Sequence, residues 1–374
     1  MRVAVVAEFY PRRGDGVLGV WAHRQALAAR DAGAEVSVFV LHRLVPPLGQ
    51  PRSLWALARQ PTFTQPDGLP VRYVRYVSPP RSRAYARWGA YAAPALRRAL
   101  RRHGPFDVIH AHYAVPAADA VLRAGIDAPL VVSVHGGDVL WTSSHVPGGR
   151  EAVERGLAAA RLVLANSAGI EALSREHGAR EVRVVHLGAD VPPVPGEPAA
   201  QPLIASLGHL VARKRHADVL RSLAQLPGVR YLIVGDGPER GRLEGLAGEL
   251  GVAARVEFAG QLEPGQAARR IGAAWCLAMP STEEAFGVAY IEAMAAGVPA
   301  VGRAGEPGPE EIAAAGAGIE LVETDRLTDA LRRLTSDRAA RDRLGAAARE
   351  TVLREFTWRL CGERTVAAYA EARA

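Results

Sequence analysis

Residues 280–299 read PSTEEAFGVAYIEAMAAGVP, and this stretch decides how the chain is expected to fold. The short apolar run Cys276–Met279 precedes it, a helical pattern fills its second half, and the apolar run Ala300–Gly302 follows it. A buried strand, a glycine turn, a helix and another buried strand are the repeating unit of a parallel sheet wrapped by helices. We therefore predict a doubly wound α/β domain here.

The same alternation of short apolar runs and helical patterns extends over the whole chain. Expected strands in the first half are Val3–Ala7, Glu35–Val40, Val71–Val77, Val108–His112, Val131–Val134, Leu162–Ala165 and Val182–Val185. Those in the second half are Leu203–Leu207, Tyr231–Val234, Val256–Phe258, Cys276–Met279 and Ala300–Gly302. The proline-rich stretch Leu187–Pro202 cannot continue a helix or a central strand, so it is predicted to be a linker. We expect domains at 1–190 and 200–356, and a last helix at 357–374 that packs back on the first domain.

Composition limits the class of protein. The chain has 374 residues, of which 49% are hydrophobic and 23% charged, as in ordinary soluble globular proteins. No apolar run approaches the roughly 20 residues of a membrane-spanning helix. Its two cysteines, Cys276 and Cys361, form no CxxC pair, which fits a reducing cytoplasm and excludes a structural zinc site.

Positive charge is concentrated in the first half of the chain. Residues 1–200 carry 24 arginines and 16 acids, a net +8, whereas residues 201–374 carry 22 cations and 23 acids, a net −1. Between Arg43 and His103, twelve arginines face one acid, Asp67, which predicts an anionic partner such as a membrane surface. In the segment Ser82–Arg102, which Pro94 should kink, we expect Tyr85 and Trp88 to insert shallowly into such a surface. The alternative is a solvated helix in a chain of arginine-biased composition.

The stretch 280–299 also has the residues of a ligand site. Glu284 and Glu292 are separated by seven residues, so that both carboxylates can face one ligand. Phe286, Gly287 and Val288 should lie at the start of the helix, where free backbone N–H groups and the helix dipole favour a phosphate. The alternative is that these acids only favour the helix N-terminus and face solvent.

The whole string resembles the signature of the retaining sugar-nucleotide glycosyltransferases of family 4. The resemblance implies the GT-B fold, two Rossmann-like domains that face each other across a cleft, and a role for this string in binding the donor sugar, pyrophosphate and ribose. The segment Leu207–Arg215 is similar to the family segment whose Lys and Arg hold the donor diphosphate, which implies that role for Lys214 and Arg213. His209 and Arg215 stand where the family usually has Arg and Gly. The turn Val234–Glu239 also matches and implies that Gly235 lies near the donor base.

The first half carries the remaining family motifs. Gly19 best matches the glycine loop through which the family approaches donor phosphate and acceptor. His135, in the segment His135-Gly136-Gly137-Asp138, matches the family histidine beside the transferred sugar. The resemblance thus implies His135, Lys214 and Glu284 as catalytic residues. On the acceptor side, the expected residues are His110, His112 and Asp138.

We expect a cytoplasmic hexosyltransferase that uses a UDP-, GDP- or ADP-sugar. No Asp is followed two positions later by another Asp, so neither metal nor cofactor is expected. The segments around His23 and His110 resemble the branch that builds cell-surface polysaccharides such as teichuronic acid, which implies a glycan or lipid-linked acceptor. Peripheral attachment at the inner face of the membrane stays open. The alternatives are a GT-B-fold sugar-nucleotide epimerase and a non-catalytic basic binding module. No nucleic-acid motif accompanies the basic segment, and we expect no nucleic-acid partner.

Overall fold

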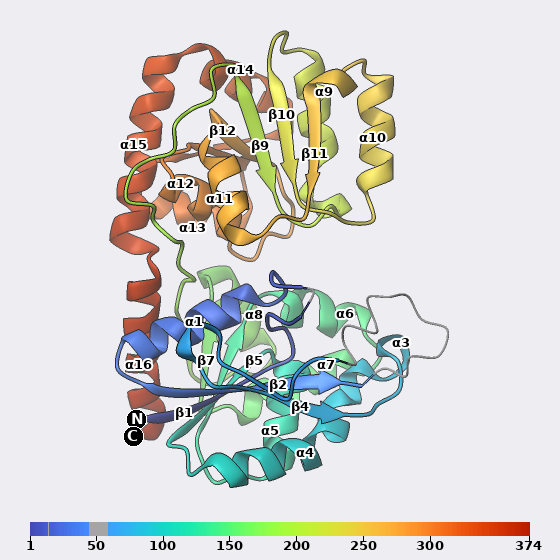
Figure 1. The fold of residues 1–374 in the computed structure, drawn as a ribbon, viewed down its shortest axis with the longest axis vertical. Coiled ribbons are helices and arrows are strands. Elements are labelled where there is room, and N and C mark those ends of the chain that lie inside the picture. Colours follow the sequence, from blue (N-terminus) through green and yellow to red (C-terminus); the bar gives the residue numbers. More distant parts are fainter. Residues whose placement is uncertain (14, 45–58) are drawn as a thin grey trace. The chain divides into compact units, whose positions relative to one another are not determined.

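A computed structural model describes residues 1–13, 15–44 and 59–374. The chain divides into two compact units, each with its own sheet (Figure 1). Unit 1 consists of Met1–Leu187 and Trp358–Ala374, and unit 2 of Gly188–Thr357. Two doubly wound α/β units were predicted, and this fold class is confirmed. The chain leaves unit 1 at the proline-rich stretch, and α16 (Trp358–Arg373) returns to pack against α1 (Val20–Asp31) of unit 1.

Described strands of unit 1 form an eight-stranded sheet in the order β3-β4-β2-β1-β5-β6-β7-β8. They are β1 (Arg2–Ala7), β2 (Glu35–Arg43), β3 (Phe63–Thr64), β4 (Val71–Tyr76), β5 (Val108–His112), β6 (Leu130–Val134), β7 (Leu162–Ala165) and β8 (Val182–Val184). The further α-helices are α3 (Arg81–Ala84), α4 (Trp88–His103), α5 (Asp119–Ala124), α6 (Ser143–His145), α7 (Gly149–Ala159) and α8 (Ala168–Glu176). Short 3-10 or π-helical turns are η1 (Pro66–Gly68), η2 (Tyr85–Arg87), η3 (Ala114–Ala118) and η4 (Gly137–Thr142).

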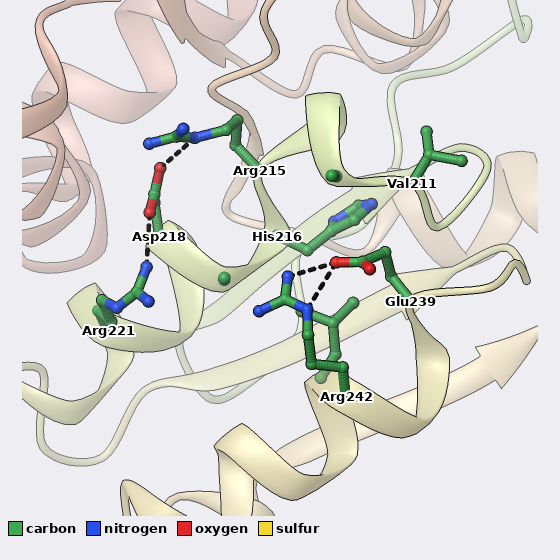
Figure 2. Close-up of a pocket in the computed structure, with 10 residues that line it drawn as sticks. Val211, Arg215, His216, Asp218, Arg221, Glu239 and Arg242 are labelled. Atoms are coloured by element: carbon green, nitrogen blue, oxygen red, sulfur yellow. Dashed lines mark hydrogen bonds and ion pairs between the residues drawn. The ribbon is translucent and has the colours of Figure 1, made fainter.

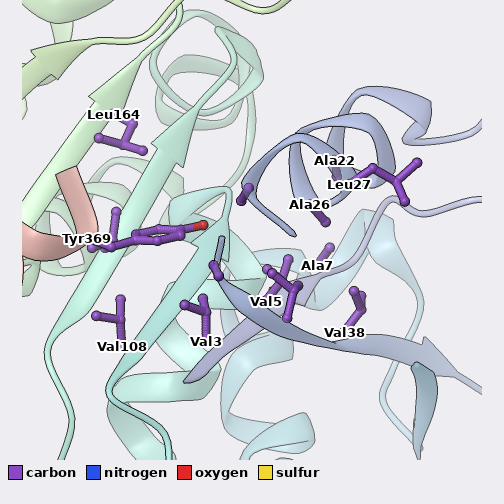
Figure 3. Close-up of a cluster of buried hydrophobic side chains, with 14 of the residues drawn as sticks. Val3, Val5, Ala7, Ala22, Ala26, Leu27, Val38, Val108, Leu164 and Tyr369 are labelled. Atoms are coloured by element: carbon purple, nitrogen blue, oxygen red, sulfur yellow. The ribbon is translucent and has the colours of Figure 1, made fainter. Parts of the chain in front are cut away.

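The core of unit 1 forms where β1 lies at the centre of its sheet. Val3 of β1 pairs in register with Val36 of β2 and Val108 of β5, so that residues of three strands share one apolar face. Helix α1 covers this face with Ala22 and Ala26, and Tyr369 of α16 enters the same cluster (Figure 3). Burial of such side chains contributes about 1.5–3 kcal/mol each, which fixes α16 on unit 1 although it follows unit 2 in the sequence.

The sheet of unit 2 has the order β11-β10-β9-β12-β13-β14. Its strands are β9 (Leu203–Leu207), β10 (Arg230–Val234), β11 (Val256–Gly260), β12 (Cys276–Met279), β13 (Ala300–Arg303) and β14 (Ile319–Val322). Its α-helices are α9 (His216–Ala224), α10 (Arg240–Glu249), α11 (Pro264–Gly272), α12 (Val288–Ala295), α13 (Pro307–Ala315), α14 (Leu327–Ser336) and α15 (Arg338–Glu355). Short turns are η5 (Ala212–Lys214), η6 (Ala253–Arg255) and η7 (Thr324–Arg326). Apolar clusters lie on both faces of this sheet, with alternate residues of β10 in each.

The structure corrects the expectation for the basic segment. Tyr85 and Trp88 are only 2% and 6% exposed, so they are core residues and cannot insert into a membrane. Trp88 Nε1 donates to the Pro79 carbonyl at 3.0 Å, which fixes the indole inward. Pro94 lies in the interior of helix α4, which extends from Trp88 to His103. Arg52 and Trp55 of the segment lie outside the described residues.

Two strands were not predicted. The strand β3 is only two residues long and pairs antiparallel with β4, so the sheet of unit 1 is not wholly parallel. The strand β14 adds a parallel edge to unit 2 next to β13. In the part of the chain that the structure describes, no helix is long and apolar enough to cross a membrane.

Candidate active site

The predicted donor-binding residues of unit 2 follow the carboxyl ends of neighbouring strands. Gly235 follows β10, Lys214 lies in the turn after β9, and Glu284 follows β12; these three strands are adjacent in the sheet. In parallel sheets, ligands bind beyond the carboxyl ends of the strands. The sheet order therefore brings together residues that lie up to 70 positions apart in the sequence.

Lys214 and Glu284 form the central contact of this group. Lys214 Nζ lies 2.5 Å from Glu284 Oε2, and the two side chains are only 12% and 9% exposed. Backbone contacts bring the two loops together, because Thr282 N–H donates to the Arg213 carbonyl at 2.8 Å. The Arg213 side chain is exposed and donates to the Glu283 carbonyl at 3.4 Å. A buried ammonium held by a carboxylate can bind a phosphate oxygen without first losing a full water shell.

Helix α12 begins at this pair. Gly287 is its N-cap, with a φ of 96° that favours glycine, and Val288 is the first helical residue. The Phe286 side chain points into the core, where its ring meets Phe356 at 5.6 Å, so only its backbone can face a ligand. Glu292 is exposed, one turn further along the same helix. A helix N-terminus next to an ammonium group is a favourable place for a diphosphate.

Gly235 is needed because two loops pass very close to each other. A Cβ at this position would lie 1.9 Å from the Gly208 carbonyl oxygen, and its φ is 136°. Any larger residue would separate the loops after β9 and β10. Gly235 thus keeps the turn after β10 close to the loop after β9, which contains Gly208 and carries Lys214.

In unit 1, the predicted histidines lie at the ends of the adjacent strands β5 and β6. His112 Nδ1 and His135 Nε2 are 2.9 Å apart, and the two rings are stacked with an interplanar angle of 4°. Burial lowers the pKa of His135 to about 3 and that of His112 well below its usual value, so both rings are neutral. One must then donate and the other accept. His135 Nδ1 and His112 Nε2 have no hydrogen-bond partner among the described residues.

His110 has a different environment. It is 1% exposed, and both ring nitrogens have hydrogen-bond partners at 2.7 Å, Tyr369 Oη from α16 and Ser133 Oγ from β6. Burial lowers the pKa of His110 to about 3. The ring also lies 4.6 Å from that of His112. His110 therefore supports the His112–His135 pair from the core, and neither of its ring nitrogens is left to bind an acceptor substrate.

Asp138 is fully buried beside the histidines. Its Oδ1 accepts from Ala114 N–H at 3.0 Å, whereas Oδ2 has no partner among the described residues. Burial, and to a smaller degree the charge of Glu8, raises the pKa of Asp138 to about 8. The carboxyl group is therefore protonated at neutral pH.

Gly19 lies where the loop after β1 turns into α1. Its φ is 67°, and a Cβ there would lie 2.1 Å from the Phe9 carbonyl carbon. Two residues later, the Trp21 ring lies 6.2 Å from the His135 ring. The close approach at Gly19 thus places the start of α1 next to the predicted catalytic histidine.

Sequence reasoning missed two carboxylates. Glu306, after β13, accepts from Glu284 N–H at 3.3 Å and extends the donor group to a fourth strand. Glu8, at the end of β1, accepts from Tyr85 Oη at 2.7 Å and lies 3.7 Å from Arg81, and burial raises its pKa. Neither belongs to a recognisable motif. Glu8 has one signal, an acid directly after an apolar strand, whereas Glu306 lies three residues after β13 and has none.

The two halves of the chain match two family models. Residues 18–191 match the model described as glycosyltransferase family 4, and residues 190–351 match that of glycosyl transferases group 1. The solved structures that resemble the chain also have the two-unit GT-B architecture. Sucrose-phosphate synthase from Thermosynechococcus elongatus has a TM-score of 0.81 at 21% identity and is covered over 99% of both chains. HepE from Anabaena, in complex with UDP and glucose, has a TM-score of 0.74 at 19% identity over 98% of this chain and 99% of its own.

Curated relatives agree with this assignment. A GDP-mannose-dependent monoacylated alpha-(1-6)-phosphatidylinositol monomannoside mannosyltransferase from Corynebacterium glutamicum is 30% identical over 66% of this chain and 73% of its own. The D-inositol 3-phosphate glycosyltransferase of Mycobacterium tuberculosis is 30% identical over 76% of this chain and 65% of its own. The lipopolysaccharide core biosynthesis glycosyltransferase LpsE of Rhizobium meliloti is 31% identical over 43% of this chain and 47% of its own. The chain thus spans less than two thirds of the latter two relatives. It belongs to glycosyltransferase family 4 and is a glycosyltransferase with a nucleotide-sugar donor.

Proposed function

We propose that the protein is a retaining, metal-independent hexosyltransferase that transfers a sugar from a nucleoside-diphosphate sugar to a glycan or lipid-linked cell-surface precursor. The observation that carries this proposal is the Lys214–Glu284 pair at the start of α12. A buried ammonium and a helix N-terminus are positive groups that can act on a leaving diphosphate in place of a cation. Glu292 binds the ribose hydroxyls, and Arg213 adds charge next to Lys214.

The reaction breaks the bond between the anomeric carbon and the diphosphate oxygen. The acceptor oxygen attacks from the same face, and its proton passes to the departing diphosphate. Negative charge on the diphosphate grows during this step, so Lys214 and the α12 N-terminus stabilise the transition state more than the bound donor. Neutral His135 acts on the transferred sugar by hydrogen bonding, since its low pKa keeps it uncharged.

The acceptor is proposed to be presented at an anionic membrane. Relatives named for phosphatidylinositol mannoside and for lipopolysaccharide core synthesis support a lipid-linked or polysaccharide acceptor. The branch such as teichuronic acid, expected from the sequence, stays a prediction. Arg97, Arg98, Arg101 and Arg102 of α4 are exposed and have no ion-pair partner among the described residues. Such a helix face attracts anionic lipid. The enzyme would then work in the cytoplasm at the inner face of the membrane.

A donor panel tests the proposal. UDP-, GDP- and ADP-sugars are incubated with the full chain and a lipid-linked acceptor extract, with and without EDTA, and the anomeric configuration of the product is read by NMR. Transfer with retained configuration that EDTA leaves unchanged is the expected result. Inverted product, or activity lost with EDTA and restored by magnesium, contradicts it. Release of free nucleotide and epimerised sugar without acceptor indicates the epimerase instead.

A further inference from the structure

Unit 2 contains a pocket of about 200 Å³ at the N-terminal ends of α9 and α10 (Figure 2). Its charged lining residues are Arg215, Asp218, Arg221, Glu239 and Arg242, and its wall includes His216. None of the proposed donor-binding residues lines this pocket. Its wall includes Arg215 and His216, which directly follow Lys214 in the sequence, so the pocket adjoins the donor group without containing any of its proposed residues. The proposed function leaves it unused.

The three arginines give the pocket an excess of positive charge. Asp218 is shared by two of them, with Arg215 Nε at 2.7 Å and Arg221 Nη1 at 2.8 Å from its oxygens. Arg242 pairs with Glu239 (Figure 2). Three guanidinium groups against two carboxylates leave one net positive charge. Each guanidinium has five N–H donors, of which these contacts use one or two, so donors remain for an anion.

His216 adds a specific acceptor to the wall. The side chain is 2% exposed, and its Nε2 has no hydrogen-bond partner among the described residues. Figure 2 shows its ring between Val211 and Glu239. Burial, together with the nearby charge of Lys214, lowers the pKa of His216 to about 4, so the ring is neutral. A buried polar atom without a partner is costly, which points to a ligand that supplies one.

A buried hydrogen-bond chain decides what Nε2 can do. Ser206 Oγ donates its proton to the Ala278 carbonyl at 2.6 Å, so Tyr231 Oη, 2.7 Å away, must donate to Ser206. Tyr231 Oη then has no proton left and accepts from His216 Nδ1, 3.3 Å away. The proton of the neutral ring is thus on Nδ1, and Nε2 is a hydrogen-bond acceptor. The ligand must offer both anionic oxygens to the arginines and an O–H to Nε2.

We propose that this pocket binds monohydrogen phosphate, with its charged oxygens on Arg215, Arg221 and Arg242 and its O–H donated to His216 Nε2. The first turns of α9 and α10 both border the pocket and favour an anion there. Sulfate has nearly the same shape but carries no proton near neutral pH. At about pH 8 a phosphomonoester, whose second pKa is about 6, has also lost its O–H. The pocket therefore distinguishes inorganic phosphate from both.

The test is isothermal titration calorimetry of the full chain at about pH 8 and constant ionic strength. The ligands are inorganic phosphate, sulfate and methyl phosphate, which has no O–H at this pH. We compare wild type with Arg221→Gln/Arg242→Gln, which removes two exposed pocket cations without disturbing the core. The matched control is Arg269→Gln/Arg343→Gln, which removes two exposed arginines of the same unit outside the pocket. Lys214→Ala removes the donor-site cation.

Phosphate should bind wild type and the control alike, should still bind Lys214→Ala, and should bind the pocket variant at least about tenfold more weakly, the loss expected for charge-assisted hydrogen bonds. Sulfate and methyl phosphate should bind at least about tenfold more weakly than phosphate to wild type. Three outcomes overturn the proposal: no phosphate binding, equal binding of sulfate, or loss of phosphate binding in Lys214→Ala with retention in the pocket variant. The last would place phosphate at the donor group. None of these readouts depends on transferase activity, so a result that contradicts phosphate binding in the pocket does not contradict the proposed function.

Discussion

Lys214 and Glu284 show at the residue scale how one contact serves both stability and chemistry. Lys214→Ala should cost about 3 kcal/mol of unfolding free energy, because it leaves the Glu284 carboxylate 9% exposed and without its cation. Adding Glu284→Gln should restore part of that stability by removing the uncompensated charge. Turnover should stay low in both variants, since the diphosphate has lost its ammonium.

Urea unfolding and initial rates for the two single variants and the double variant complete this cycle. A coupling free energy of about 0.5–3 kcal/mol is expected for residues in direct contact. Additive stability effects would mean that the pair contributes nothing as a pair. Full activity in the double variant would mean that the diphosphate is held elsewhere.

Glu292 is proposed to bind the donor ribose. Glu292→Ala should weaken the binding of nucleoside diphosphate by about 1.5–3 kcal/mol, the scale of a charged hydrogen bond, and leave stability nearly unchanged because the side chain is exposed. Calorimetric titration measures the affinity. Glu249→Ala, an exposed glutamate at the end of α10, is the control. Equal affinities in the two variants would exclude Glu292 from the site.

Asp138 should give unit 1 a characteristic pH dependence. Burial raises its pKa from 3.8 to about 8, so between these values the folded form keeps a proton that the unfolded form has lost. Stability should therefore fall as pH rises through this window, by at most about 1.4 kcal/mol per unit. Asp138→Asn cannot titrate and keeps the oxygen that accepts from Ala114 N–H. As the pH rises from about 5 to about 8, the difference in unfolding free energy between Asp138→Asn and wild type should change by about 1–4 kcal/mol in favour of the variant. If urea unfolding gave the same pH dependence of stability for wild type and Asp138→Asn, Asp138 would be ionised in the folded protein.

At the scale of elements, every strand with a neighbour on each side could be predicted from the sequence, and so could the edge strands β8 and β11, whereas the edge strands β3 and β14 could not. Val3–Ala7 and Cys276–Met279 are buried along their length, so their apolar runs are unmistakable. The edge strand β14 has one buried residue in four, and β3 has only two residues. An edge strand needs less apolar sequence because one side of it faces no neighbour. Tyr85 and Trp88 were wrongly predicted to lie at the surface, because the arginines around them are typical of an exposed segment although the turn is buried.

The contact between α16 and α1 depends on one glycine. A Cβ on Gly362 would lie 2.2 Å from the Ala28 carbonyl oxygen of α1, so Gly362→Ala must push the helices apart. We expect a loss of about 1–3 kcal/mol, the usual cost of overpacking. Gly245→Ala on α10 is the matched control, since no atom lies within 4 Å of its Cβ position and alanine favours helix by about 0.5–1 kcal/mol. Urea unfolding should show opposite signs for the two variants. A neutral Gly362→Ala would mean that α16 is not held tightly on unit 1.

For the whole molecule, the predictable part of the site was the part encoded by local motifs. Lys214, Glu284 and His135 each follow a strand within a short recognisable segment. Tyr369, by contrast, bonds to His110 from 259 positions away, and Glu306 reaches Glu284 from another strand. Such partners are set by tertiary packing, which sequence patterns of one element do not record. His110 has no free ring nitrogen because α16 returns to unit 1 and brings Tyr369 to it, which the sequence alone does not indicate.

Charge on unit 1 should bind the protein to anionic membranes. The face of α4 exposes Arg97, Arg98, Arg101 and Arg102, and Tyr91 is 41% exposed on the same helix. Each arginine near an anionic surface contributes about 1 kcal/mol, and salt limits the field to about 8 Å at physiological ionic strength. Co-sedimentation with phosphatidylglycerol vesicles should therefore decrease as salt rises. Phosphatidylcholine vesicles should bind little.

The matched variants distinguish membrane binding through this face of α4 from binding through the net charge of the whole chain. Changing the four α4 arginines to Gln should abolish most of the binding, because it removes about 4 kcal/mol of attraction. The control removes the same charge from exposed arginines of unit 2, namely Arg230, Arg269, Arg326 and Arg343. It should bind nearly as well as wild type. If both variants lose binding equally, attraction depends only on net charge and α4 has no special role. If neither loses binding, the arginine excess reflects composition, and a soluble acceptor becomes the better proposal.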